Sequence, residues 1–125
     1  MDYSQLSDFE INKLVAYALG NADVGRPFDE ISGTACRFTV FKNSGLNREG
    51  EIVMRPMTVT KDFCNNPEDA WPIIADNHIG IAPYPSEAFA WSSRHGMVSD
   101  LSTEDKNPLR AAMVVFLMMK DEHYA

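Results

Sequence analysis

Apolar positions recur at helical spacing near the beginning of the chain. From Asp8 to Leu19 they fall three and four residues apart and form one stripe, which is typical of an amphipathic helix. Ser7 occupies the N-cap position with Glu10 three residues later, as a capping box requires, and Gly20 is a typical helix stop. We therefore predict a helix over this segment.

The next third of the chain has the pattern of strands and turns. Residues 21–35 are rich in glycine and proline and predict a loop. Residues 37–42 and 52–60 are rich in β-branched and aromatic residues and predict two strands, joined by a turn or a longer hairpin connection at 43–50. Pro56 interrupts the second strand, so we expect an edge position or a bulge there.

A second helix is predicted where Asn66 precedes Pro67, because this pair matches an N-cap followed by proline at the first helical position. Pro72 removes a backbone hydrogen bond inside the helix. We therefore expect a short, kinked helix, or one turn leading into another, that ends near Asn77. Trp71, at the start of this helix, is expected to pack in the core.

Two short apolar runs follow this helix. Residues 79–82 and 89–92 predict short strands, and the mainly polar residues 93–106 predict a loop.

The last helix is predicted to begin where Asn107 precedes Pro108 and to end near Glu122. Its apolar positions from Ala111 to Met119 cover nearly every face, which indicates burial on most sides. Together the elements predict an α+β fold in a single domain, residues 1–125. It would contain a small antiparallel sheet, an N-terminal amphipathic helix, a short kinked middle helix and a largely buried C-terminal helix.

Charge and composition exclude several classes of protein. The 125 residues carry 11 basic and 18 acidic side chains, a net charge of −7, with no run of basic residues. We expect no nucleic-acid partner, because neutralisation of phosphates supplies most non-specific affinity for DNA and RNA. We also expect no membrane association, since the charge is unfavourable and the longest apolar run is shorter than the about 18–20 residues of a transmembrane helix.

The two cysteines, Cys36 and Cys64, share no metal-type spacing with the three histidines. We expect reduced, partly buried thiols in a cytoplasmic protein. No P-loop, dinucleotide fingerprint, nucleophile elbow or zinc signature is present. We therefore expect no cofactor, no metal and no catalytic residues.

A group of aromatic and basic residues is the candidate ligand-binding site. An aromatic-lined pocket can stack a base, and basic loop residues can contact an anion. The alternative is that the aromatics pack in the core and that the basic residues are solvated. The candidate residues are Trp91, Arg94, His95, Arg55 and Tyr84.

Three blocks of sequence carry a family resemblance. They are residues 2–12 (DYSQLSDFEIN), residues 64–74 (CNNPEDAWPII), and residues 107–119, which read NPLRAAM and then FLMM after two valines. Through these blocks the chain resembles the NinX-like proteins of lambdoid bacteriophages and prophages of enteric bacteria. The resemblance implies a phage-encoded accessory protein in the bacterial cytoplasm. The family has no known function and therefore supplies no catalytic or binding residues.

Three hypotheses for the function remain open. The first is a non-enzymatic module that binds a host or phage protein, motivated by the acidic surface and the apolar last helix. In this hypothesis the alternative partner of the last helix is a second copy of the chain, in a homodimer. The second is a small-molecule binder of nucleotide type that sequesters its ligand against host defence. The third is a small enzyme acting on nucleic acid or nucleotide.

Overall fold

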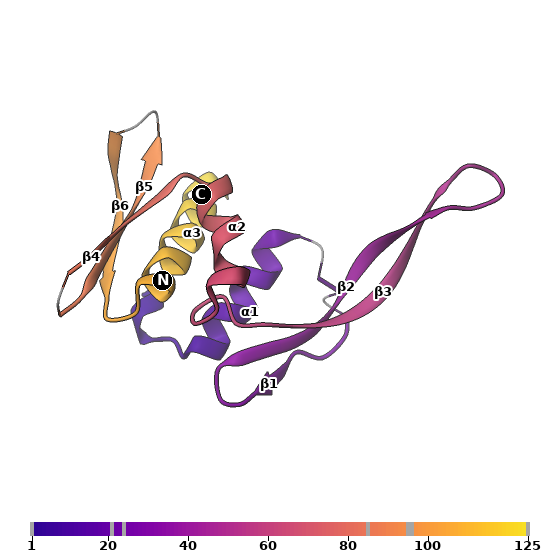
Figure 1. The fold of residues 1–125 in the computed structure, drawn as a ribbon, viewed down its shortest axis with the longest axis horizontal. Helices are drawn as coiled ribbons and strands as arrows, with labels where there is room; N and C mark the ends of the chain where they lie inside the picture. The colour runs from indigo at the N-terminus through magenta and orange to yellow at the C-terminus, as the bar shows by residue number, and fades with distance from the viewer. Residues whose placement is uncertain (1, 21, 24, 85, 95–96, 125) are drawn as a thin grey trace.

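Two small antiparallel sheets and three α-helices make up the part of the chain that the structure describes (Figure 1). The structure, a computed structural model, describes residues 2–20, 22–23, 25–84, 86–94 and 97–124. The elements are a 3-10 turn (Tyr3–Gln5), α1 (Asp8–Leu19), β1 (Asp29–Ile31), β2 (Ala35–Leu46), β3 (Ile52–Lys61), α2 (Pro67–Asp76), β4 (Ile79–Pro83), β5 (Ala88–Arg94), β6 (Met97–Asp105) and α3 (Pro108–Tyr124). The predicted α+β class is confirmed, with two sheets in place of one.

The first helix begins and ends as predicted. The Ser7 side chain accepts a hydrogen bond from the backbone N–H of Glu10 at 3.1 Å, and its hydroxyl donates to the Glu10 carboxylate. Gly20 ends the helix with a φ of 86°, a left-handed conformation that glycine adopts without steric cost. Ile11 and Val15, from the predicted stripe, are fully buried.

The first sheet has the order β1-β2-β3. Residues 29–31, predicted as loop, form the short strand β1, because their backbone pairs with the beginning of β2 although aspartate and glutamate disfavour strands. Strand β2 continues into the predicted turn as far as Leu46, so the connection to β3 shrinks to residues 47–51. Pro56 lies on β3, which is an edge strand, as predicted.

The second helix runs through Pro72 as one ten-residue helix. Asn66 caps it as predicted, since its side chain accepts a hydrogen bond from the backbone N–H of Glu68 at 3.0 Å. At the other end, the backbone N–H of Asn77 donates to the carbonyl of Ile73. The sequence patterns therefore placed both ends of α2 correctly.

The second sheet has the order β4-β5-β6, and the prediction of a loop over residues 93–106 is wrong. Residues 97–105 form β6 and pair with β5. This strand was missed because most of its side chains are polar and it lacks the regular apolar alternation of a half-buried strand. Its backbone hydrogen bonds with β5 determine its conformation.

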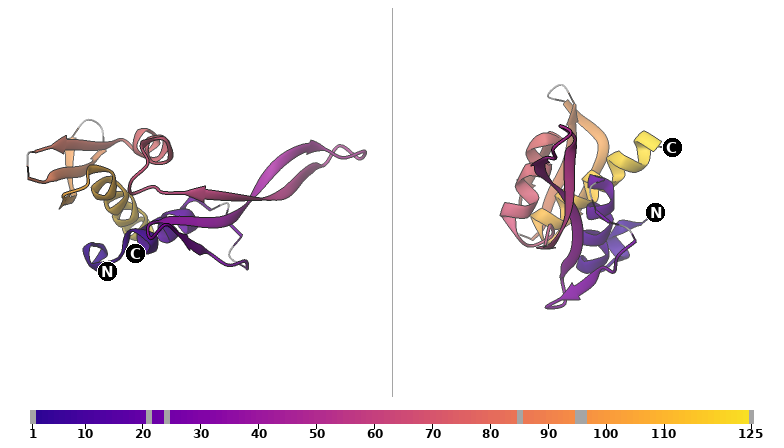
Figure 2. Two further views of the ribbon diagram at one scale, coloured as in Figure 1. Left: turned by 60° about the horizontal axis from the view of Figure 1, so that its bottom comes forward. Right: turned by 90° about the vertical axis from the view of Figure 1, so that its right-hand side faces the viewer.

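Helix α3 lies at the centre of the fold, with β4, β5 and β6 on one side and α1 and α2 on the other (Figures 1 and 2). Asn107 caps it by accepting hydrogen bonds from the backbone N–H groups of Leu109 and Arg110. Every residue from 111 to 117 is buried, which confirms the predicted burial. Among the residues that the structure describes, no helix is long and apolar enough to cross a membrane.

Candidate functional site

The three sequence blocks that carry the family resemblance meet at one polar cluster. Arg110, at the start of α3, is its most connected member. Its guanidinium donates to Asp8 at 2.7 Å, to Asp105 at 2.9 Å, and to the carbonyl oxygens of Ser4 and Leu6. Burial alone lowers the pKa of Arg110, but the hydrogen bonds to the two carboxylates outweigh it and raise the pKa. The arginine is therefore held fully charged.

A buried amide forms the other half of this cluster. Asn12, fully buried on α1, donates to the carbonyl of Thr34 at 2.8 Å and to the Asp62 carboxylate at 3.0 Å. Its side-chain oxygen accepts from the backbone N–H of Cys64 at 3.1 Å. Asn107 donates to the Cys64 carbonyl at 2.6 Å and so connects α3 to the same segment.

The polar cluster is saturated with internal hydrogen bonds. Within the described residues, no buried side-chain nitrogen or oxygen lacks a partner, and no group of histidine, cysteine and carboxylate side chains is arranged to hold a metal ion. A polar network whose members are all satisfied specifies one packing arrangement. We therefore assign this cluster a structural role.

The two cysteines are free and buried, as predicted. Burial raises the pKa of the Cys36 thiol to about 11 and raises that of Cys64 further. Because the thiolate is the reactive form, both side chains are unreactive at neutral pH.

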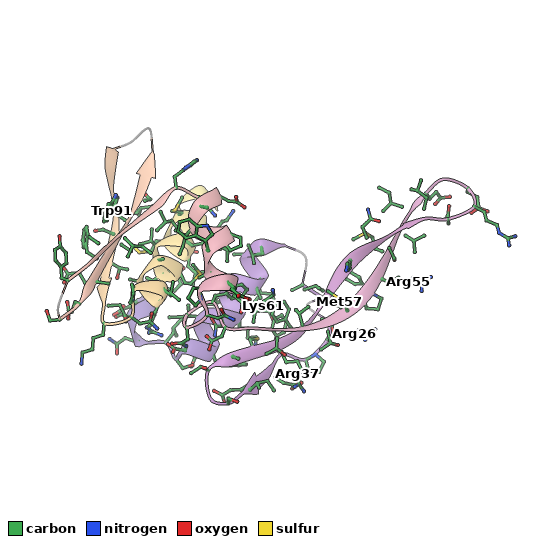
Figure 3. The ribbon with its side chains drawn as sticks, viewed as in Figure 1. Arg26, Arg37, Arg55, Met57, Lys61 and Trp91 are labelled. Atoms are coloured by element: carbon green, nitrogen blue, oxygen red, sulfur yellow. The ribbon has the colours of Figure 1, made fainter. Side chains whose placement is uncertain are left out.

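The predicted ligand residues whose side chains the structure describes do not form one cluster within a single copy of the chain. Trp91 lies on β5 in the second sheet, whereas Arg55 lies on β3, at the opposite end of the molecule (Figure 3). Tyr84 follows β4 and is exposed. The side chain of Arg94 and the whole of His95 lie outside the described residues.

Trp91 packs on its own sheet. It is the register partner of Gly80, and a Cβ atom at Gly80 would lie 2.3 Å from the indole. Phe89 stacks beside it with ring centroids 5.6 Å apart. The register places both rings on the face opposite to the buried Ala88 and Ala90, away from α3. Both rings, each half-buried, therefore share the face of the second sheet that points away from α3, which we call its open face.

The prediction that Trp71 packs in the core is wrong. This side chain is exposed on α2, because the buried face of the helix is formed by Ala70, Ile73 and Ile74. A helix position next to the buried stripe points to solvent, and the cap pattern alone did not fix which face was buried.

The most prominent feature of the molecule is a protruding two-stranded ribbon, residues 41–57, which we call the arm (Figures 1 and 2). It consists of the outer halves of β2 and β3, and every residue in it except the half-buried Val53 is exposed. From Phe41 to Leu46 it extends by about 17 Å at the rise of a β-strand. An isolated two-stranded hairpin is only marginally stable in water.

One face of the arm is apolar. Residues that are register partners, or two apart on one strand, share a face. Phe41 is opposite Pro56, and Leu46 is opposite Ile52. Met54 lies between Ile52 and Pro56 on β3, opposite Asn43, which is the polar residue on this face. We call the five apolar residues the apolar row. The exposed fractions are 42% for Phe41, 69% for Leu46, 64% for Ile52 and 51% for Met54, so the row is open to solvent.

The other face of the arm carries two cations directly opposite each other. Lys42 and Arg55 are register partners, and no carboxylate among the described residues forms an ion pair with either. Like charges at opposed positions in an antiparallel pair are destabilising. The arm therefore has an unpaired positive face as well as an uncovered apolar one.

A groove with a volume of about 390 Å³ lies at the base of the arm. Its floor is apolar and formed by the inner parts of β2 and β3, through Phe38, Val40, Met57 and Val59. Figure 3 shows Lys61 beside the body, Met57 at the base of the arm and Arg55 farther out along it.

The wall opposite this floor is α2, which contributes two exposed carboxylates, Glu68 and Asp76. Asp69, also in the wall, is engaged with Lys61 at 3.5 Å. No ion pair to Glu68 or Asp76 is found in the described part of the chain. The groove therefore has an apolar floor and an acidic wall.

Sequence reasoning missed the arm because it assigned residues 43–50 to a turn or hairpin connection. The available signal was Leu46, an apolar residue inside a supposedly polar turn, with Ile52 and Met54 spaced two apart after it. Such positions fit a strand pair that continues into solvent.

Comparison with known proteins gives the affiliation of the chain. A family model described as "Bacteriophage P22, NinX" matches residues 2–120. Neither the curated proteins nor the solved structures yielded a match. The match spans the three sequence blocks, the polar cluster that they form and the arm. The chain therefore belongs to the NinX family of bacteriophage proteins.

Proposed function

We propose that this phage accessory protein is a non-enzymatic module that binds another protein through its arm. The observation that carries the proposal is the exposed apolar row, from Phe41 to Ile52, on a ribbon that projects from the body. Contiguous apolar surface of this kind is typical of interaction sites. The last helix, which the sequence suggested as a partner surface, has its apolar residues 111–117 inside the fold, so the arm is the better candidate.

Charge favours a protein over nucleic acid as the partner. The arm carries Lys42, Arg48 and Arg55 against Glu49 and Glu51, a net charge of +1, so the rest of the chain carries −8. A ribbon that follows DNA needs several phosphate contacts, and an acidic body would be repelled by the same phosphates. We therefore expect no shift of duplex DNA at physiological salt.

Photocrosslinking in cells tests the proposal. A photoreactive phenylalanine analogue is placed at Ile52 on the arm, and in a matched control at Glu104, an exposed position on β6. During phage growth we expect a discrete protein adduct from position 52 and none from position 104. If position 52 gives no protein adduct, the proposed function fails. Mass spectrometry of the adduct identifies whether the captured protein is a different one or the same chain.

A second candidate function, binding of a nucleotide-type small molecule, is favoured by the Phe89 and Trp91 rings on the open face of the second sheet. Aromatic rings on a sheet can stack a base. A Trp71→Phe variant leaves Trp91 as the single tryptophan, so its fluorescence reports on this face. We expect quenching together with a rise in Tm for a true ligand. If no nucleotide changes either quantity, this candidate is removed.

A further inference from the structure

We infer that the partner of the arm is a second copy of this chain, and that each copy inserts its arm into the groove of the other. This inference rests on the proposed function and names the occupant of the same site. It is motivated by the arm and the groove together, which form a complementary pair of surfaces on one molecule.

The two faces of the arm match the two sides of the groove. The groove lies between the apolar strand floor, with Val40 and Met57, and the α2 wall, with Glu68 and Asp76. An inserted ribbon would place one face on the floor and the other toward the wall. The apolar row suits the floor, and Lys42 and Arg55, on the opposite face, suit the carboxylates. In the dimer, the apolar row would thus be covered and the unpaired cations would gain carboxylate partners, neither of which happens in a single copy.

The charge distribution makes a second copy the appropriate occupant. An arm of net charge +1 is attracted to a body of net charge −8, and the unpaired cations and carboxylates lie on the two contacting surfaces. Complementary potentials of this kind select partner and register. To bind in this groove, a segment of another protein would need one apolar face and one cationic face, as the arm has.

Twofold symmetry doubles the contact. In an isologous dimer, the arm of each copy lies in the groove of the other, so every contact is made twice. Each arm-in-groove contact then has to bury only about 800 Å² of the about 1,600 Å² in a standard interface. The cost of holding an uncovered hairpin in water is removed at the same time.

A reciprocal charge exchange tests the inference. The arm variant carries Lys42→Glu and Arg55→Glu, and the groove variant carries Glu68→Lys and Asp76→Lys. All four side chains are exposed, so both variants should fold, which circular dichroism checks. Glu68 lies near the N-terminus of α2 and Asp76 at its C-terminus, so the two groove changes have opposing effects on the helix dipole.

The measurement is the mass in solution by sedimentation equilibrium over a range of concentrations and salt. We expect a wild-type dimer that weakens as salt rises. Each variant alone should show at least about a tenfold rise in dimer Kd, because like charges then face each other in both contacts. An equimolar mixture of the two variants should restore the dimer, because each arm then meets a groove of opposite charge.

Three results would overturn the inference: a wild-type chain that stays monomeric, a single variant that dimerises as tightly as wild type, or a mixture that stays apart although wild type dimerises. A monomeric wild type whose position 52 crosslinks a different protein in cells would disprove self-association and leave the proposed function standing. An absence of protein adducts at that position, with a monomeric chain, would disprove both.

Discussion

Arg110 Nη1 lies 2.7 Å from Asp8 Oδ1, so a salt bridge joins two residues that are 102 positions apart. The same guanidinium holds Asp105 and two backbone carbonyls of residues 4 and 6. A planar group with five donors suits this set of acceptors, and a lysine could not reproduce its geometry. The N-terminal segment is therefore fastened to the first turn of α3 by one side chain.

Substitution of Arg110 by Met should lower the free energy of unfolding by about 3 kcal/mol, because Asp8 and Asp105 would lose the cation between them. Arg110→Lys should recover only part of this loss. Urea denaturation followed by circular dichroism measures the change. The matched control is Arg48→Met on the exposed tip of the arm, which should stay within about 0.5 kcal/mol of wild type. Equal effects at both positions would contradict the structural role of Arg110.

Gly80→Ala should destabilise the chain by about 1–3 kcal/mol, because the new Cβ atom would overlap the indole of Trp91. In a Trp91→Ala background the same change should be neutral or slightly stabilising, since alanine restricts the unfolded chain more than glycine does. Thermal unfolding of the four proteins gives the coupling between the two positions. Additive effects would show that the indole does not lie on Gly80.

The buried thiols should affect stability at alkaline pH. A thiol with a raised pKa in the folded state favours folding fully below its ordinary pKa of 9, and this contribution is lost as pH rises from about 9 through 11. We expect the fall in Tm over this range to be smaller in a Cys36→Ala variant than in wild type. At pH 8, neither Cys36 nor Cys64 should react with a thiol reagent until the chain unfolds. Rapid modification of the folded protein would contradict their burial.

The arm should be dispensable for folding. Because Lys42 and Arg55 are register partners, a two-residue Asn-Gly turn can replace residues 43–54 and close the hairpin at its base. All but one of the removed residues are exposed in a single copy of the chain, so the free energy of unfolding of the monomer should change by less than about 1 kcal/mol. Urea denaturation tests this at a concentration and salt at which wild type is monomeric, because a dimer held by the arm would add its own stability. A loss of about 3 kcal/mol or more would mean that the arm packs against its own body.

The ends of the helices could be predicted from the sequence because capping is local. Ser7, Asn66 and Asn107 each lie within three residues of the N–H group that they accept from. What local patterns could not reveal is that the three neighbourhoods meet directly, since Asn107 also donates to Cys64 and Asn65, and Asn65 donates to Asp8. Contacts between residues more than forty positions apart carry no periodic signal.

Most of the candidate site could not be predicted, for a related reason. The groove is formed by a floor from the first sheet and a wall from α2. The residue spacing within either segment gives no information about contact with the other. The strand β6 was missed because its backbone pairs with β5 despite a polar sequence. The arm was missed because turn-forming residues such as Asn43 and Gly45 occur inside an extended strand, where the register shifts by one position.

The salt bridge between Asp8 and Arg110 also has a consequence for synthesis of the protein. A ribosome that adds 5–20 residues per second needs about 5–20 s to proceed from the first of these residues to the second. During that interval α1 can form as a local helix, but the central position that α3 will fill is empty. Folding of the body must therefore wait for late translation, and the nascent chain exposes Ile11 and Val15 until then.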